Sequence, residues 1–136
     1  EPTTSLEAAL SYLNRVVKRH AIVFLVSDCW DAGFERPLRL TARKHDLTVI
    51  RISDPAEEKL PDVGRIYLRD PETGETVLIN SSNRTLRRRW EAARRERLAA
   101  LRSLLQRTGV DEVVLSTDGP VVEPLARLFD RRRLRS

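Results

Sequence analysis

The sequence predicts an α/β fold in which one parallel sheet carries helices on both faces. Three short apolar runs, at residues 21–26, 47–52 and 113–115, are rich in strand-forming side chains, which is typical of buried parallel strands. Segments with the apolar spacing of amphipathic helices separate these runs along the chain. Because parallel strands need crossover connections, this alternation favours three layers.

The first two helical segments are short and amphipathic. Residues 5–18 follow a capping box in which the Thr4 hydroxyl accepts a hydrogen bond from the backbone N–H of Glu7. The second segment, residues 37–44, begins with a proline, which suits the first turn of a helix. Each segment precedes one of the apolar runs, as a crossover helix does.

An irregular region separates the second and third apolar runs. Residues 65–68 and 76–79 have strand character and flank the turn-forming sequence Asp-Pro-Glu-Thr-Gly at 70–74. This pattern predicts a β-hairpin inserted into the fold. Residues 122–129 predict a last helix after the third run.

A long helix is predicted over residues 84–108, and Gly109 suits its C-terminal end. Arg94 and Arg97 fall on its apolar face. Either these side chains extend over the rim of the core, or the first half of the helix projects past the sheet.

Length and composition fit a single globular domain spanning residues 1–136. The longest apolar run has six residues, far below the roughly 20 needed to cross a bilayer. A single cysteine, Cys29, excludes an internal disulfide and favours a reducing compartment. We therefore expect a cytoplasmic location, with any membrane anchor of a full-length protein upstream of Glu1.

The net charge of +5 is unevenly distributed along the chain. Residues 84–136 hold 14 basic and seven acidic residues, whereas residues 1–83 hold 11 and 13. The arginines between Arg84 and Arg97 favour a solvated helix face over nucleic-acid binding, because Trp90 is the sole aromatic residue among them.

Three carboxylates follow the apolar runs: Asp28, Asp54 and Asp118. Because the carboxyl ends of parallel strands meet at one edge, these oxygens would converge there and suit Mg²⁺. Aspartate is also a favoured loop and N-cap residue, which accounts for each position separately. No glycine-rich phosphate loop is present.

Two aromatic residues, Trp30 and Phe34, lie in the loop after the first run. Aromatic side chains at this edge either cap the core or anchor a protein partner. Cys29, in the same loop, has no base nearby in the sequence and is interpreted as a structural side chain.

Five segments carry a resemblance to the bacterial domain-of-unknown-function family 58, in matching order over nearly the whole chain. They are FLVSD at 24–28, ERPLRL at 35–40, ARKHD at 42–46, LPDVG at 60–64 and DPETG at 70–74. The resemblance implies a three-layer, parallel-sheet, von Willebrand A-like (Rossmann-like) fold. It also implies a non-enzymatic role beside a MoxR-type AAA+ ATPase.

The resemblance further implies a metal-ion-dependent adhesion site, built from an Asp-x-Ser-x-Ser loop, a threonine and an aspartate. Thr4 and Asp28 match the last two elements, but the sequence contains no Asp-x-Ser-x-Ser. The chain is therefore expected to be a partial domain, the back half of such a fold, with the first element upstream of Glu1. We expect no cofactor in this chain alone and Mg²⁺ only in a full-length protein.

Two functions follow from these observations. The preferred one is a protein-interaction domain that acts with a MoxR-type ATPase in assembly or chaperone-like work. It includes a homodimer, because the strand from Ala21 to Val26 would lack its upstream neighbour and expose an uncharged edge. The alternative is a small Mg²⁺-dependent nuclease or phosphotransfer module that uses Asp28, Asp54 and Asp118.

Overall fold

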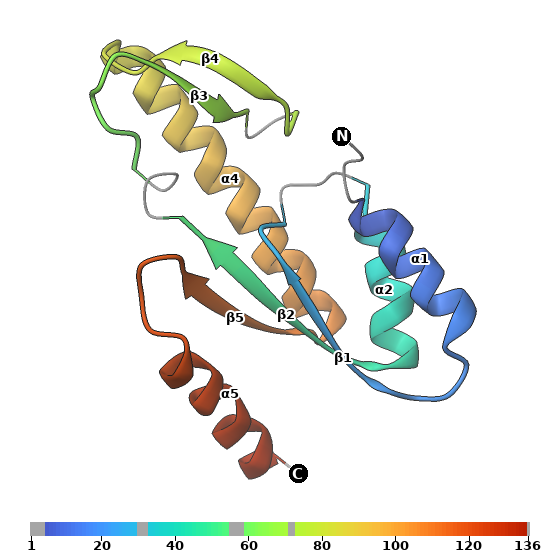
Figure 1. Cartoon of the computed structure of the whole chain (residues 1–136). Coiled ribbons are helices and arrows are strands. Elements are labelled where there is room, and N and C mark those ends of the chain that lie inside the picture. The colour runs from blue at the N-terminus through green and yellow to red at the C-terminus, as the bar shows by residue number, and fades with distance from the viewer. Residues whose placement is uncertain (1–4, 30–32, 55–58, 71–72, 136) are drawn as a thin grey trace.

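The computed structural model, which describes residues 5–29, 33–54, 59–70 and 73–135, places helices on both faces of a three-stranded parallel sheet (Figure 1). The strands, in the spatial order β1-β2-β5, are β1 (Ile22–Ser27), β2 (Asp46–Ser53) and β5 (Asp111–Ser116). The helices are α1 (Leu6–Val16), α2 (Glu35–Lys44), α4 (Arg84–Thr108) and α5 (Val122–Arg135). The α/β class and the parallel sheet with flanking helices are confirmed.

The two faces of the sheet hold two separate apolar cores. Leu47 and Val49 of β2 face a core shared with α1, α2 and the second half of α4. Ile50 and Ile52, which alternate with them, face a smaller core shared with β5 and α5, centred on the fully buried Leu128. Side chains of a strand alternate between faces, so β2 contributes to both cores.

Helix α1 begins one residue later than predicted. Ser5 is its N-cap, and the Ser5 hydroxyl accepts a hydrogen bond from the backbone N–H of Ala8 at 3.2 Å. The predicted cap, Thr4, lies outside the described residues. The helix ends at Val16 instead of residue 18.

Helices α1 and α2 are joined by a buried polar contact. The Thr41 hydroxyl lies 3.1 Å from the side-chain oxygen of Asn14 and 2.8 Å from the backbone carbonyl of Pro37. The Asn14 amide also donates to that carbonyl at 3.4 Å. Asn14 and Thr41 are both buried, so these hydrogen bonds satisfy polar groups that would otherwise destabilise the helix pair.

The prediction that the first strand is buried on both faces is wrong. Side chains of β1 alternate, with Ile22, Phe24 and Val26 exposed by 65%, 43% and 61%. Helix α5 packs over β2 and β5, and its Phe129 ring lies 6.4 Å from the ring of Phe24 on β1. β1 is therefore an edge strand whose α5-side face stays open to solvent.

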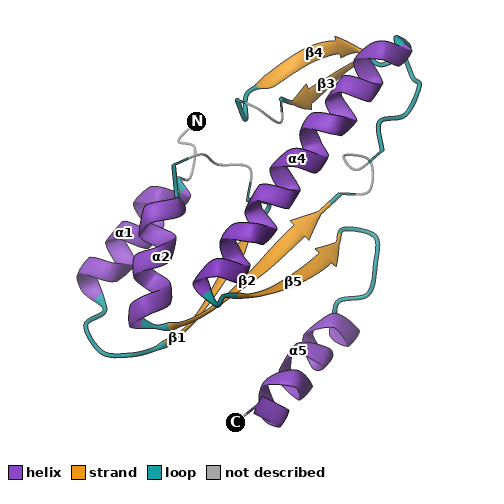
Figure 2. Cartoon of the chain, turned by 180° about the vertical axis from the view of Figure 1, so that it is seen from behind, coloured by secondary structure: helices purple, strands orange, loops and turns teal. Residues whose placement is uncertain are grey.

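The predicted hairpin is confirmed as an antiparallel pair, β3 (Arg65–Arg69) and β4 (Thr76–Asn80). Its inner side chains pack with Leu60 and Trp90 in a third apolar cluster. Trp90 lies in the first half of α4, which projects beyond the parallel sheet to meet the hairpin (Figure 2). The projecting arrangement, one of the two alternatives for the long helix, is therefore correct.

The bounds of α4 match the prediction because local chemistry sets both ends. The Asn83 side chain accepts a hydrogen bond from the Leu86 N–H at 3.2 Å, and Gly109 closes the helix with a left-handed φ of 71°. Helix α5 continues beyond the predicted residue 129, because Arg132 pairs with Asp46 and Asp111 on the sheet. In the described part of the chain, no helix is long and apolar enough to cross a membrane.

A pair of leucines on α2 tests this packing. Leu38 is fully buried in the main core, whereas Leu40 is 43% exposed. We expect Leu38→Ala to lower the free energy of unfolding by about 2–5 kcal/mol, because it leaves a cavity. Leu40→Ala should lower it by less than about 0.5 kcal/mol. Urea unfolding of both variants measures the difference, and equal losses would contradict the placement of α2.

Candidate functional site

The three predicted metal ligands lie at the carboxyl ends of β1, β2 and β5, as expected, but do not form a metal site. The Asp28 carboxylate accepts a hydrogen bond from Arg69 at 2.8 Å, and Asp118 accepts one from the Ser116 hydroxyl at 2.6 Å. Among the residues that the structure describes, no group of three or more His, Cys, Asp or Glu side chains is placed to hold a metal ion. The cluster required by the nuclease alternative is therefore not assembled.

Of the two elements matched to the adhesion site, one lies within the described residues. Thr4 lies outside the described residues. Asp28 forms an ion pair with Arg69 of β3, which links the hairpin to the end of β1. The contact engages one of the two carboxylate oxygens of Asp28, Oδ2, at 2.8 Å. Of the two predicted ligands, the described residues therefore contain Asp28 alone, and the Thr4–Asp28 site stays a prediction.

A cavity of about 280 Å³ lies between the segment after β1 and helix α4. Phe34 lines it and is also part of the main core, with only 9% of its surface exposed. This burial agrees with the capping alternative for Phe34, because a partner would reach little of the ring. Trp30, the other proposed partner-binding residue, lies outside the described residues.

Cys29 occupies an unusual backbone position beside this cavity. Its φ of 59° is the one positive value at a non-glycine residue in the described chain, and its N–H donates to the Ser27 hydroxyl at 3.0 Å. Burial raises the pKa of the thiol to about 11, with Glu112 and Asp28 adding to the rise and Arg51 opposing it. The thiol is therefore protonated at neutral pH and is not an activated nucleophile.

A buried ion pair between β2 and β5 was not predicted from the sequence. Arg51 is 5% exposed, and its Nε lies 3.3 Å from a carboxylate oxygen of Glu112. The position of Arg51 within an apolar run indicates such a pair, because a buried arginine needs an acidic partner. The partner is 61 residues away in sequence, and only the pairing of β2 with β5 brings it near.

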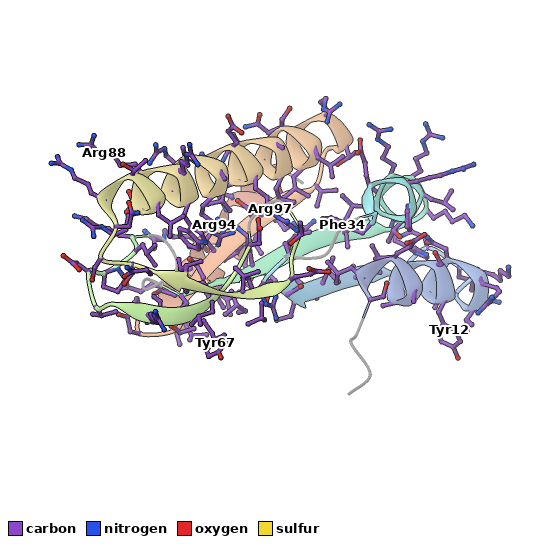
Figure 3. The ribbon with its side chains drawn as sticks, turned by 90° about the horizontal axis from the view of Figure 1, so that it is seen from above. Tyr12, Phe34, Tyr67, Arg88, Arg94 and Arg97 are labelled. Atoms are coloured by element: carbon purple, nitrogen blue, oxygen red, sulfur yellow. The ribbon has the colours of Figure 1, made fainter. Side chains whose placement is uncertain are left out.

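The arginines of α4 do not form one solvated face, which corrects the prediction for part of the run. Arg94 is buried with 3% exposure, and Arg97 is half-buried; both line the cavity (Figure 3). Arg87 donates to the Ser81 carbonyl at 2.6 Å at the start of the helix. Arg84, Arg88, Arg89 and Arg95 are exposed, as predicted.

The thiol of Cys29 allows a test of this environment. With a pKa of about 11 in place of 9.0, native Cys29 should react with iodoacetamide about 100-fold more slowly at pH 8 than an unperturbed thiol. The rate should rise steadily as the pH approaches 11. The same protein unfolded in urea should react at the unperturbed rate. Native and unfolded rates that agree at pH 8 would contradict the burial of Cys29.

Comparisons with known proteins place the chain among bacterial relatives. The family model described as "Protein of unknown function DUF58" matches residues 1–100. The uncharacterized protein MAV169 of Mycobacterium avium is 28% identical over 94% of this chain and 76% of its own length. The uncharacterized proteins Rv1480 of Mycobacterium tuberculosis and Mb1516 of Mycobacterium bovis are each 30% identical over 94% of this chain.

The lengths of these relatives differ from that of the chain. The chain spans only 40% of Rv1480 and of Mb1516. No solved structure matches the chain. Since the family model covers well over half of the sequence, in agreement with the resemblance described above, the chain belongs to the DUF58 family.

Proposed function

We propose that this chain is a non-enzymatic protein-interaction domain that acts in the cytoplasm with a MoxR-type AAA+ ATPase, in assembly or chaperone-like work. Membership of the DUF58 family supports this role, through the partnership that the resemblance implies. The helix-flanked parallel sheet is compatible with the von Willebrand A-like architecture that belongs to the same proposal. The observation that carries it is the open side of β1.

The open side of β1 combines two features of a protein-binding surface. Its outer edge has no neighbouring strand in the described sheet, so half of its backbone N–H and C=O groups lack sheet partners. Ile22, Phe24 and Val26 form an exposed apolar row beside this edge, and Phe129 of α5, 53% exposed, extends the row. Neither a charge nor a proline interrupts β1. Contiguous apolar surface of this kind marks a contact with another protein.

A binding assay with and without a charge on this row tests the proposed function. We expect the immobilised chain to retain a MoxR-type ATPase of Mycobacterium tuberculosis, and Val26→Lys to reduce the retained amount at least about tenfold, because a buried lysine is costly in an apolar contact. Leu78→Lys is the matched control, since Leu78 is 52% exposed but lies on the hairpin. The ATPase partnership is refuted if neither the chain nor full-length Rv1480 retains the ATPase, whether ATP or ADP is present.

The same edge supports self-association. A second copy that paired with β1, or packed on its apolar row, would cover both features with one two-fold contact. We therefore propose a homodimer through the strand from Ala21 to Val26 in the absence of another partner.

Sedimentation equilibrium measures the dimer directly. At high micromolar concentration the chain should sediment as a dimer, and Ile22→Lys should convert it to a monomer, because the contact would bury a lysine from each copy in an apolar surface. Val122→Lys should remain dimeric, because Val122, 77% exposed, starts α5 outside the edge. A wild-type monomer at this concentration would rule out the proposed dimer.

A further inference from the structure

Two grooves run along the sides of α2, and seven of their 15 lining residues are basic. The groove between α1 and α2 has a volume of about 660 Å³, and the one between α2 and the end of α4 about 480 Å³. Figure 3 shows nitrogen-tipped side chains fanning outward from α2. We define the basic face of α2 as the seven cationic residues that line these grooves: Arg15, Lys18, Arg36, Arg39, Arg43, Lys44 and Arg107.

The basic face concentrates the positive charge of the whole chain. One acidic residue, Glu7, lines the grooves beside the seven cations, which gives this surface a net charge of +6. The net charge of the complete chain is +5, so all other residues together carry −1. A positive field of this density attracts anionic partners and accelerates their association.

Most of these cations are available to a partner. In the described structure Arg39 forms an ion pair with Glu35, and Arg107 donates to the Ser103 carbonyl at 3.3 Å. Lys18, Arg36, Arg43 and Lys44 are exposed and form no ion pair with any described residue. Their charges are therefore not neutralised within the described part of the chain.

Helix dipoles explain part of this clustering but not all of it. Helices α1, α2 and α4 each end just before a parallel strand, so their negative C-terminal ends gather at one edge of the sheet. Each end carries the equivalent of about −0.5 charge, or about −1.5 for the three helices. The dipole charge therefore offsets about a quarter of the net charge of +6 on the basic face. It does not account for Arg36, which lies in the first turn of α2, where the helix dipole disfavours a cation.

The groove between α1 and α2 also offers an apolar contact on a rigid base. Leu40, 43% exposed, lines this groove together with Pro37. The buried contact among Asn14, Thr41 and Pro37 holds the two helices at a fixed separation. A groove with cations at its sides and a leucine within it matches an acidic amphipathic helix.

Nucleic acid fits this surface less well than an acidic protein segment. Base stacking needs aromatic platforms, and no described aromatic residue lines either groove. Tyr12, on the same helix as Arg15, points away from α2 (Figure 3), and the Arg15 guanidinium lies 5.7 Å from the centre of its ring.

We propose that the basic face of α2 is a docking surface for an acidic, leucine-containing helix of a partner protein. This inference rests on the proposed function, since it assigns a surface and a partner chemistry to the interaction domain. It is separate from the apolar row of β1, which lies at the free edge of the sheet. The two surfaces therefore suit different segments of a partner.

A designed peptide tests the proposal. A fluorescein-labelled 16-residue amphipathic helix of glutamate and leucine should bind the wild-type chain in an anisotropy titration at 50 mM NaCl. Its Kd should rise at least about tenfold at 300 mM NaCl, because exposed charges are screened. A peptide with glutamine at every glutamate position should not bind.

Two variants with equal charge changes locate the site. The first carries four substitutions on the basic face: Lys18→Glu, Arg36→Glu, Arg43→Glu and Lys44→Glu. The second, the control, carries four exposed substitutions on α4 away from both grooves: Arg84→Glu, Arg88→Glu, Arg89→Glu and Arg102→Glu. We expect the first to weaken peptide binding at least about tenfold and the second less than about threefold. Circular dichroism checks that both variants keep the wild-type fold.

Several outcomes would overturn the proposal. Equal losses in the two variants would show a response to net charge alone. The face would belong to another class of partner if it bound a 16-nucleotide RNA more tightly than the peptide. The same holds for vesicles with 30% phosphatidylserine. Retention of the MoxR-type ATPase without peptide binding would refute this docking surface and leave the proposed function standing. Peptide binding without ATPase retention would support this docking surface and refute the proposed ATPase partnership.

Discussion

The packing of β2 on both faces and both edges is the constraint on which the rest of the structure depends. Strand β2 is hydrogen-bonded to β1 on one side and to β5 on the other, and both pairs are parallel. Its alternating side chains separate the two cores, with Leu47 and Val49 on one face and Ile50 and Ile52 on the other. The three-layer arrangement follows, because each face of β2 needs helices to exclude water.

The layers cover the sheet unequally, and this inequality leaves one face of β1 exposed. In the described structure three helices cover one face, whereas α5 alone covers the opposite face, packing on β2 and β5 and meeting β1 at Phe24. The hairpin does not fill the gap, because it packs on the projecting half of α4 around Trp90. Its ion pair from Arg69 to Asp28 occupies the carboxyl edge, where parallel sheets commonly bind ligands.

The two ends of the sheet have opposite electrostatic character. At the carboxyl ends of the strands, acidic side chains are held by contacts within the chain, as Asp28 is by Arg69 and Asp118 by Ser116. At the amino ends, three helix C-termini gather and basic residues collect beside them. On the opposite face of the sheet, Arg132 of α5 pairs with both Asp46 and Asp111. The fold therefore produces a polarised surface from a modest overall charge.

Local patterns in the sequence were sufficient to locate the elements. The bounds of α4 follow from the Asn83 cap and Gly109, and the hairpin follows from the turn chemistry at 70–74. The parallel strands were located within two residues, since apolar runs report burial along a strand. These features depend on neighbours close in the chain, so the sequence alone determines them.

Other properties depend on contacts between distant elements, and only the tertiary structure decided them. The exposure of β1, the burial of Arg94 and the pairing of Arg51 with Glu112 depend on which helix or strand covers each position. The sequence also assigned the positive charge to residues 84–136. In the structure, six of the seven cations of the basic face come from α1, α2 and the residues just after α1. Packing brings these cations together and leaves most of the acidic residues of the same half elsewhere, so no count along the chain could predict the basic face.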